Sequence, residues 1–239
     1  MTNTPEESFD QLAKAYDQEM DHASPFNTHY ERPAMMKELP DDLEGLNVLD
    51  AGCSAGWYAE QLVNRGASVT GIDISSKMIK AAKYRLKERA SFFQHDLSQP
   101  LPFEDNSFDV VVSSLTLHYL KDWNDIMSEV ERILKPGGIF LYSTHHPFMD
   151  FIQMKEENYF EKKLLHDVWT KGGKTVEVSF YRRSLQEIVQ QTLQYFDLKN
   201  LIEPLPIKEM EQITADRYEY LTKNPHFLII KAGKRQVNP

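Results

Sequence analysis

Hydrophobic side chains recur along this chain at two spacings, and each spacing predicts a type of secondary structure. Between residues about 5 and 20, Phe9, Leu12 and Tyr16 fall three or four positions apart, which is the repeat of an amphipathic helix. The same repeat predicts further helices over residues about 57–64, 77–86, 122–134 and 184–195. The chain is therefore rich in helices that each present one apolar face to a core.

Polar residues and glycines mark the ends of these predicted helices. Ser76 is the expected N-cap of the second helix in the series. Ser184 and Glu187 have the spacing of a capping box and are expected to open the fourth. Gly66 is expected to end the helix that follows Trp57.

Short apolar runs lie between the helices and predict strands. They cover residues 47–50, 67–73, 91–93, 198–202 and 226–231. Strands that alternate with helices indicate the α/β class, with a doubly wound and mostly parallel sheet. Ligands of such sheets bind beyond the carboxyl ends of the strands.

Composition narrows the classes of protein that fit. The 239 residues suit one large α/β domain, and no apolar run approaches the roughly 18–20 residues of a membrane span. A net charge of −9 argues against a nucleic-acid substrate, which needs clustered Lys and Arg. The N-terminus has no signal-peptide pattern, and the lone Cys53 suits a reducing compartment, so we expect a cytoplasmic protein without membrane partners.

A strand, a turn of small residues and a helix follow one another in residues 47–58 (NVLDAGCSAGWY). Because the turn at Gly52 carries no bulky side chain, backbone N–H groups at the helix start can approach a ligand closely. Asp73 closes the next apolar run and is expected to lie beside the turn, where its carboxylate can accept hydrogen bonds from a ribose diol. The pattern indicates a ligand that contains adenosine.

Two other families use similar turns. A nicotinamide-binding turn needs glycine at the position of Trp57, where close packing of helix on strand requires it. Residues 52–56 (GCSAG) also fit the nucleophile elbow of α/β-hydrolases, with Ser54 as the nucleophile. That elbow normally follows several strands and a loop that supplies an oxyanion donor, whereas the residues before Asn47 are expected to be helical.

Residues 50–56 (DAGCSAG) resemble Asp-x-Gly-x-Gly-x-Gly, the first motif of class I S-adenosylmethionine-dependent methyltransferases. Ser54 stands in place of the middle glycine. A serine there is tolerated if its φ is negative and is strained if its φ is positive.

Three later segments resemble further motifs of the family's small-molecule branch. Residues 95–97 (HDL) resemble the acid after the third strand, beside the adenine. Residues 107–120 resemble the fourth strand with its following histidine, and residues 134–138 (LKPGG) resemble the turn before the fifth. Four motifs in this order, across roughly residues 47–147, make the chain similar to methyltransferases of type 11.

The resemblance implies one domain over residues 1–239, with a Rossmann-like seven-stranded sheet in the order 3-2-1-4-5-7-6 and the last strand antiparallel. It also implies a division into an N-terminal helical lid (1–46), a cofactor-binding core (47–146), a substrate-cap insertion (147–183) and C-terminal helices and strands (184–232). Aromatic residues in the first and third parts are the expected source of substrate specificity.

The implied cofactor is S-adenosyl-L-methionine. The residues expected to bind it are Tyr16, Asp50, Gly52, Cys53, Ser54, Gly56, Asp73, Ile74, Met78, Asp96, Leu97, Ser113 and Ser114. Tyr16 and the N-terminal segment are expected to close over it.

The pattern contains no obvious catalytic dyad, and methyl transfer explains why. The sulfonium is an activated leaving group, so an aligned acceptor matters more than covalent catalysis. If a general base is needed, His118 and His145 are the expected candidates. Adjacent residues of a strand point to opposite faces, so His145 and His146 cannot both face one site, and no metal set is expected.

We therefore expect an enzyme that transfers a methyl group to a small-molecule acceptor. Absence of an Asn/Asp-Pro-Pro-Tyr stretch after the fourth strand, where residues 113–116 (SSLT) stand, favours an oxygen or carbon acceptor. A cofactor-binding module without turnover and a hydrolase acting through Ser54 remain as alternatives.

Overall fold

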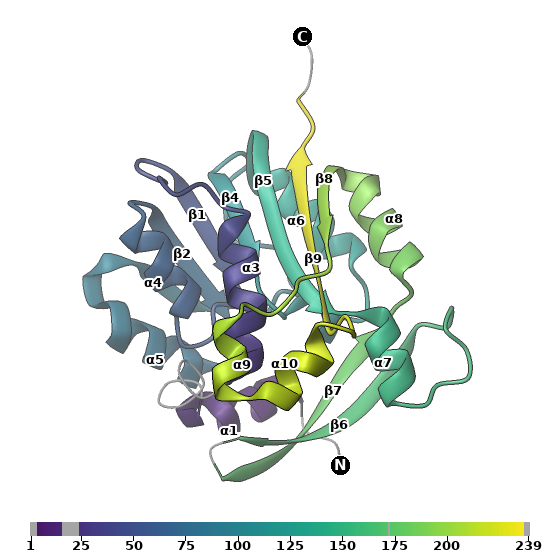
Figure 1. Ribbon diagram of the computed structural model, residues 1–239. Coiled ribbons are helices and arrows are strands. Elements are labelled where there is room, and N and C mark those ends of the chain that lie inside the picture. Colours follow the sequence, from purple (N-terminus) through teal and green to yellow (C-terminus); the bar gives the residue numbers. More distant parts are fainter. Residues whose placement is uncertain (1–3, 16–23, 172, 237–239) are drawn as a thin grey trace.

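The computed structural model describes residues 4–15, 24–171 and 173–236, and its centre is one seven-stranded sheet (Figure 1). The strands of this sheet are β1 (Asn47–Ala51), β2 (Ser68–Asp73), β3 (Ser91–Gln94), β4 (Phe108–Ser113), β5 (Leu134–His145), β8 (Phe196–Ile202) and β9 (Phe227–Lys234). Strand β9 pairs antiparallel with both β5 and β8, and the pairs among β1 to β5 are parallel. The predicted α/β class is confirmed.

The strands lie in the order β3-β2-β1-β4-β5-β9-β8. When only the strands of this sheet are counted along the chain, that is the predicted order 3-2-1-4-5-7-6. The labels differ because β6 (Lys163–Lys171) and β7 (Lys174–Arg182) form a separate antiparallel hairpin, which the sequence analysis did not predict. This hairpin lies within the segment expected to be a substrate cap.

Helices cover both faces of the sheet. The helical segments are α1 (Pro5–Ala15), η2 (Asn27–Glu31), α3 (Arg32–Lys37), α4 (Trp57–Asn64), α5 (Ser76–Leu86), η3 (Lys87–Arg89), η4 (Leu117–Tyr119), α6 (Asn124–Ile133), α7 (Pro147–Gln153), α8 (Leu185–Tyr195), α9 (Glu209–Ile213) and α10 (Ala215–Leu221). Within the described residues, none of these helices is both long and apolar enough to cross a membrane.

Alternate residues of the central strands point into two separate cores. Val110 packs with the apolar faces of α3, α4 and α5, whereas its neighbour Val111 packs with α6 and α8. Ile229 and Ile230 of β9 divide in the same way. Because both faces are covered, the central strands contain continuous apolar runs, such as residues 110–112 of β4 and 227–230 of β9.

The helix ends follow the sequence signals with one correction. Ser184 caps α8, since its hydroxyl accepts a hydrogen bond from the Glu187 N–H at 3.2 Å, which confirms the predicted start of this helix. The cap of α5 is Ser75, whose hydroxyl accepts from the Met78 N–H, so the prediction of Ser76 is wrong by one residue. Only Ser75 has the extended backbone that lets a cap side chain reach back to the third helical N–H.

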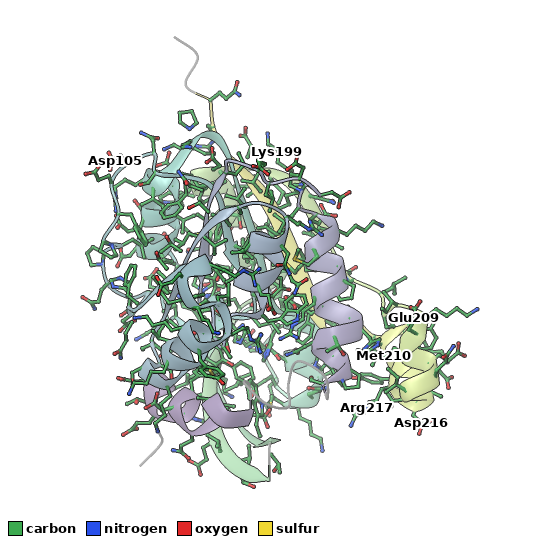
Figure 2. All side chains as sticks on the ribbon, turned by 90° about the vertical axis from the view of Figure 1, so that its left-hand side faces the viewer. Asp105, Lys199, Glu209, Met210, Asp216 and Arg217 are labelled. Carbon is green, nitrogen blue, oxygen red and sulfur yellow. The ribbon has the colours of Figure 1, made fainter. Side chains whose placement is uncertain are left out.

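Segments outside the sheet gather at the carboxyl ends of the parallel strands. Figure 1 shows α1, the β6–β7 hairpin, α9 and α10 at this end, with the C-terminus at the other. Helix α1 joins the hairpin to the core, because Leu12 packs on Val176 and Val178 whereas Ala13 packs on Ala55. Figure 2 shows α9 and α10 at the side of the molecule, where Met210 anchors them in a cluster with Tyr30.

The Ser184 cap gives a test of local stability. We expect Ser184→Ala to lower the free energy of unfolding by about 1 kcal/mol, because the Glu187 N–H loses its partner. Urea denaturation measures the change. Gln186→Ala, at an exposed position of the same helix, is the control and should leave the midpoint unchanged; equal effects of the two substitutions would contradict the capping role.

Candidate active site

A cavity of about 1030 Å³ opens at the carboxyl ends of the parallel strands. Its floor follows the order of the sheet: Asp96 after β3, Asp73 at the end of β2, Gly52 after β1, Ser114 after β4, His145 at the end of β5 and Phe227 at the start of β9. Phe9 of α1 and Trp169 of the hairpin line it from the other side. The N-terminal helix and the hairpin are thus parts of the cavity wall.

The turn after β1 adopts left-handed backbone at three positions. Gly52 has a φ of +85°, and a Cβ atom at this residue would collide with the side chain of Thr116. Glycine is therefore required here by the fold as well as by any ligand. Ser54 has a φ of +50°, the strained case for a serine, which costs about 1–2 kcal/mol relative to right-handed backbone.

Asp73 holds this turn in place. Its Oδ2 accepts a hydrogen bond from the Ser54 N–H at 2.9 Å, and its Oδ1 accepts one from the Ser75 N–H at 2.8 Å. Burial raises the pKa of Asp73 to about 6, although the two backbone hydrogen bonds act in the opposite direction. Each carboxylate oxygen has a second lone pair. The side chain lines the cavity, so those lone pairs can serve a bound hydroxyl.

Four of the residues expected at the cofactor support the turn from outside the cavity lining. Asp50 accepts a hydrogen bond from the Ala59 N–H at 3.1 Å and so fixes the start of α4. Met78 accepts one from the Ser54 hydroxyl, and Ser113 donates one to the Ala51 carbonyl. A Cβ atom at Gly56 would lie 3.1 Å from Ala82 and Leu86 of α5, so this glycine allows two helices to pack closely.

The other expected residues are brought together around the cavity, with one outside the described residues. Those that line it are Gly52, Cys53, Ser54, Asp73, Ile74, Asp96, Leu97, Ser114, His118 and His145. Tyr16 lies outside the described residues. Cys53 is buried, and burial raises the pKa of its thiol well above the usual value, which suits a small packing residue and not a nucleophile.

Ser54 does not have the surroundings of a hydrolase nucleophile. Its hydroxyl donates to the Met78 sulfur at 3.4 Å, and so its hydrogen bond goes to a thioether instead of a base. A serine nucleophile needs a base within hydrogen-bond reach. The geometry gives the hydrolase alternative no support.

Glu31 has no role that the sequence alone indicated, and it is almost completely buried at the cavity wall. Its carboxylate accepts hydrogen bonds from Tyr58 (2.7 Å), Ser114 (2.8 Å) and Ser143 (2.6 Å). Burial raises its pKa, and the three hydrogen bonds counteract that rise. Glu31 thereby joins η2 to α4 and to the ends of β4 and β5.

Arg32, the next residue, also lines the cavity. Its guanidinium lies over the ring of Trp57, 4.2 Å from the ring centroid. Glu31 and Arg32 belong to a segment that the sequence assigned only as part of a lid. A charged pair next to a proline (residues 31–33, ERP) was the available signal, but nothing in the local pattern indicates burial.

The two expected catalytic histidines lie face to face. The ring centroids of His118 and His145 are 4.1 Å apart with an interplanar angle of 23°. His146 points elsewhere, as the alternation of a strand predicts: its Nε2 lies 2.9 Å from Glu203 Oε1, and its Nδ1 accepts from the Phe148 N–H. Among the described residues, no group of three or more His, Cys, Asp or Glu side chains is arranged to hold a metal ion.

Comparison with known proteins gives a family match for the core of the chain. Residues 49–142 match the model of a methyltransferase domain. The chain is 34% identical over 164 residues to a demethylmenaquinone methyltransferase of Lactococcus lactis, with 65% of this chain and 64% of that protein covered. It is 36% identical over 99 residues to a malonyl-[acyl-carrier protein] O-methyltransferase of Buchnera aphidicola, with 41% and 39% covered. The chain thus spans less than two thirds of either relative.

Solved structures show a similar arrangement over most of the chain. A protein from Listeria monocytogenes assigned to the S-adenosylmethionine-dependent methyltransferases has a TM-score of 0.76 and 28% identity, over 86% of this chain and 97% of that one. A methyltransferase of the same kind from Mesorhizobium loti has a TM-score of 0.68 and 24% identity, over 85% and 97%. At that identity, the second likeness shows the fold alone.

The buried Asp50 gives a prediction about pH. Burial, with a further contribution from Asp73, raises the pKa of Asp50 to about 7. The native state therefore favours the protonated form, whose stabilising contribution is present below pH 4 and is lost as the pH rises to about 7. We expect Asp50→Asn to be more stable than the parent at pH 8 by on the order of 2–4 kcal/mol, with a smaller gain at pH 5.

Urea denaturation of both proteins between pH 5 and pH 8 measures this difference. Asp105→Asn is the control: this exposed residue pairs with Arg132, so any change in stability should be the same at every pH in this range. A stability difference between Asp50→Asn and the parent that stays constant across this range would contradict the protonation of Asp50.

Proposed function

We propose that this chain is an S-adenosylmethionine-dependent methyltransferase and that it transfers a methyl group from S-adenosyl-L-methionine to a small-molecule acceptor. One observation carries the proposal: the unobstructed turn at Gly52 and the doubly held carboxylate of Asp73 line the same cavity. The names of the two relatives, a demethylmenaquinone methyltransferase and a malonyl-[acyl-carrier protein] O-methyltransferase, support a small-molecule acceptor.

The order of the strands supports an order of subsites along the cavity. An adenine would lie beside Asp96 and Leu97 after β3, and the ribose would lie over Asp73 at the end of β2. The methionine part would then follow the turn after β1. Arg32, on the wall of the cavity, places a positive charge where the methionine carboxylate would lie. The methyl group would point toward the ends of β4 and β5.

The chain's own contribution to the reaction is binding, alignment and exclusion of water. S-adenosylmethionine supplies the methyl group on an activated sulfonium. A cavity that holds donor and acceptor in line can contribute about 7–11 kcal/mol by positioning alone. Its volume of about 1030 Å³ is at the upper end of the range of small-molecule sites, which suits two molecules bound together.

Helix α1 is the proposed lid over the cofactor. It holds the hairpin through the Ser8 hydroxyl, which donates to the Glu177 carbonyl at 2.8 Å, and Phe9 packs against Tyr119 with ring centroids 5.0 Å apart. The side chain of Asp10 meets Ser75 and Lys77 at the start of α5. The cap segment 147–183, with the hairpin, would close the acceptor side. The lone cysteine and the acidic composition support a cytoplasmic location and argue against nucleic-acid substrates.

Asp73→Ala tests the cofactor site. The variant would lose two charge-assisted hydrogen bonds to the ribose, each contributing about 1.5–3 kcal/mol. We expect at least tenfold weaker binding of S-adenosylmethionine, measured by calorimetry.

Asp105→Ala is the matched control. Asp105 lies outside the cavity lining, whereas Arg217 belongs to it, and Figure 2 shows the two residues at opposite ends of the molecule. Replacement of Asp105 should therefore leave the affinity for S-adenosylmethionine unchanged. Because Asp73 also holds the turn, circular dichroism should first establish that the Asp73→Ala protein is folded. Unchanged affinity in a folded Asp73→Ala protein would refute the site.

Hydrogen exchange tests the lid. If α1 closes over bound cofactor, residues 5–15 should gain protection when S-adenosylhomocysteine is added, because closure removes their amides from solvent. The measurement compares free and ligand-bound protein, with α8 as an internal reference on the other face of the sheet. Slow exchange of α1 in both states would show a permanently docked helix and rule out the lid.

A further inference from the structure

The part of the cavity at β4, β5 and β9 differs in chemistry from the part at β1 to β3. It is lined by rings, namely Phe26, His118, His145, Phe180, His226 and Phe227. Building on the proposed function, we propose that this part binds an aromatic ring that carries a hydroxyl group, and that His145 takes the hydroxyl proton as the methyl group is transferred to that oxygen.

The ring of His145 is fixed by other rings. His118 stacks on it with ring centroids 4.1 Å apart, and Phe180 meets it edge to face at 4.6 Å with an interplanar angle of 80°. Phe227 lies nearly parallel to it at 6.1 Å. Aromatic groups prefer offset-stacked and edge-to-face partners at such separations, so walls of this kind favour a flat aromatic guest.

His226 and Phe26 extend the same surface, with ring centroids 4.9 Å apart, and His226 also meets Phe227 edge to face at 4.9 Å. An acceptor seated against these rings would lie beside His145 and next to the end of β4, where the methyl group would point. An aliphatic acceptor could also bury apolar surface here, but it could not make the stacked and edge-to-face ring contacts that an aromatic acceptor makes.

Asp150 of α7 gives His145 a counter-charge. The Oδ1 atom of Asp150 lies 3.4 Å from the Nδ1 atom of His145, and both side chains are largely buried. A carboxylate at this distance stabilises the imidazolium that forms when the ring accepts a proton. Asp150 is therefore a positioning residue that acts through His145.

Other titratable groups lie around His145: His118 from η4, His226 from the residue before β9, and Tyr181 and Arg183, which line a small pocket together with His145 and Asp150. Burial lowers the pKa of His118 well below its usual value, and burial lowers the pKa of His226 to about 4. Both rings are consequently uncharged at neutral pH. Of these three imidazoles, His145 is the one with a carboxylate oxygen 3.4 Å from its Nδ1 atom, so a proton that it accepts has a counter-charge nearby.

The transfer balances without a further reagent. The hydroxyl oxygen forms a bond to the methyl carbon as the methyl–sulfur bond breaks, and the sulfur keeps that electron pair. His145 takes the hydroxyl proton and later releases it to solvent, leaving an aryl methyl ether and S-adenosylhomocysteine. A phenolic hydroxyl, with an ordinary pKa of about 10, gives up its proton far more readily than an aliphatic hydroxyl, so an imidazole can accept it.

The first experiment measures transfer of labelled methyl groups from S-adenosylmethionine to catechol, 4-nitrophenol and 1-naphthol. Benzyl alcohol and aniline present a similar ring with a different acceptor group. We expect methylation of at least one of the three hydroxyarenes, in preference to benzyl alcohol and aniline. Calorimetric binding of S-adenosylmethionine is measured in parallel, since failure to bind it would overturn the proposed function itself.

The second experiment compares variants on the best hydroxyarene. His145→Gln should lower kcat by 100-fold or more, because the variant lacks the group that accepts the hydroxyl proton. Its affinity for S-adenosylmethionine should stay within twofold of the parent's. Asp150→Asn should lower kcat about tenfold and move the acidic limb of its pH profile to lower pH, because the imidazolium loses its counter-charge. His166→Gln, an exposed histidine of β6 outside the cavity lining, should match the parent.

Three results would overturn the inference while leaving cofactor binding intact. These are no turnover of any hydroxyarene, preferred turnover of benzyl alcohol or aniline, and full retention of kcat by His145→Gln. If Asp150→Asn lowers kcat but leaves the pH profile unshifted, Asp150 does not act through the charge of His145.

Discussion

The pairing of β1 with β4 at the centre of the sheet is the constraint on which the site depends. Val48 pairs with Val110 and Asp50 with Val112, so the two strands end side by side. The chain leaves β1 toward β2 and β3, whereas it leaves β4 toward β5. Because these connections diverge, a crevice must open at the carboxyl ends of the two strands. Each group that lines the crevice takes its place from the strand that it follows.

Buried carboxylates hold the edges of that crevice. Asp73 fixes the turn after β1, Asp50 fixes the start of α4, and Glu31 joins η2 to the ends of β4 and β5. Burial raises the pKa of each of these groups, so their ionised forms cost folding free energy. Ser54 adds local strain through its positive φ. These free-energy costs are concentrated at the site, where the same residues hold the ligand-binding groups in a fixed geometry.

Local patterns in the sequence were sufficient for the α/β class and for the glycine turn, whereas the order of the strands came from the family resemblance. Strands buried on both faces are continuous apolar runs, and the motif at residues 50–56 has a spacing that few turns share. The hairpin β6–β7 was missed because its strands carry many polar residues and lie outside the shared core. The roles of Glu31 and of Asp150 were missed for another reason. Each depends on partners far away in the chain, such as Ser143 for Glu31, and no local pattern encodes that contact.

A structure of the protein bound to S-adenosylhomocysteine tests the central claim most directly, because the order of the strands assigns each part of the ligand to a strand end. The account predicts the adenine beside Asp96 and Leu97, the ribose hydroxyls on Asp73, and the sulfur atom directed toward Ser114, with the ring-lined part at β5 and β9 left for the acceptor. A ligand found in the reverse direction, or seated among His145, Phe180 and Phe227, would contradict it.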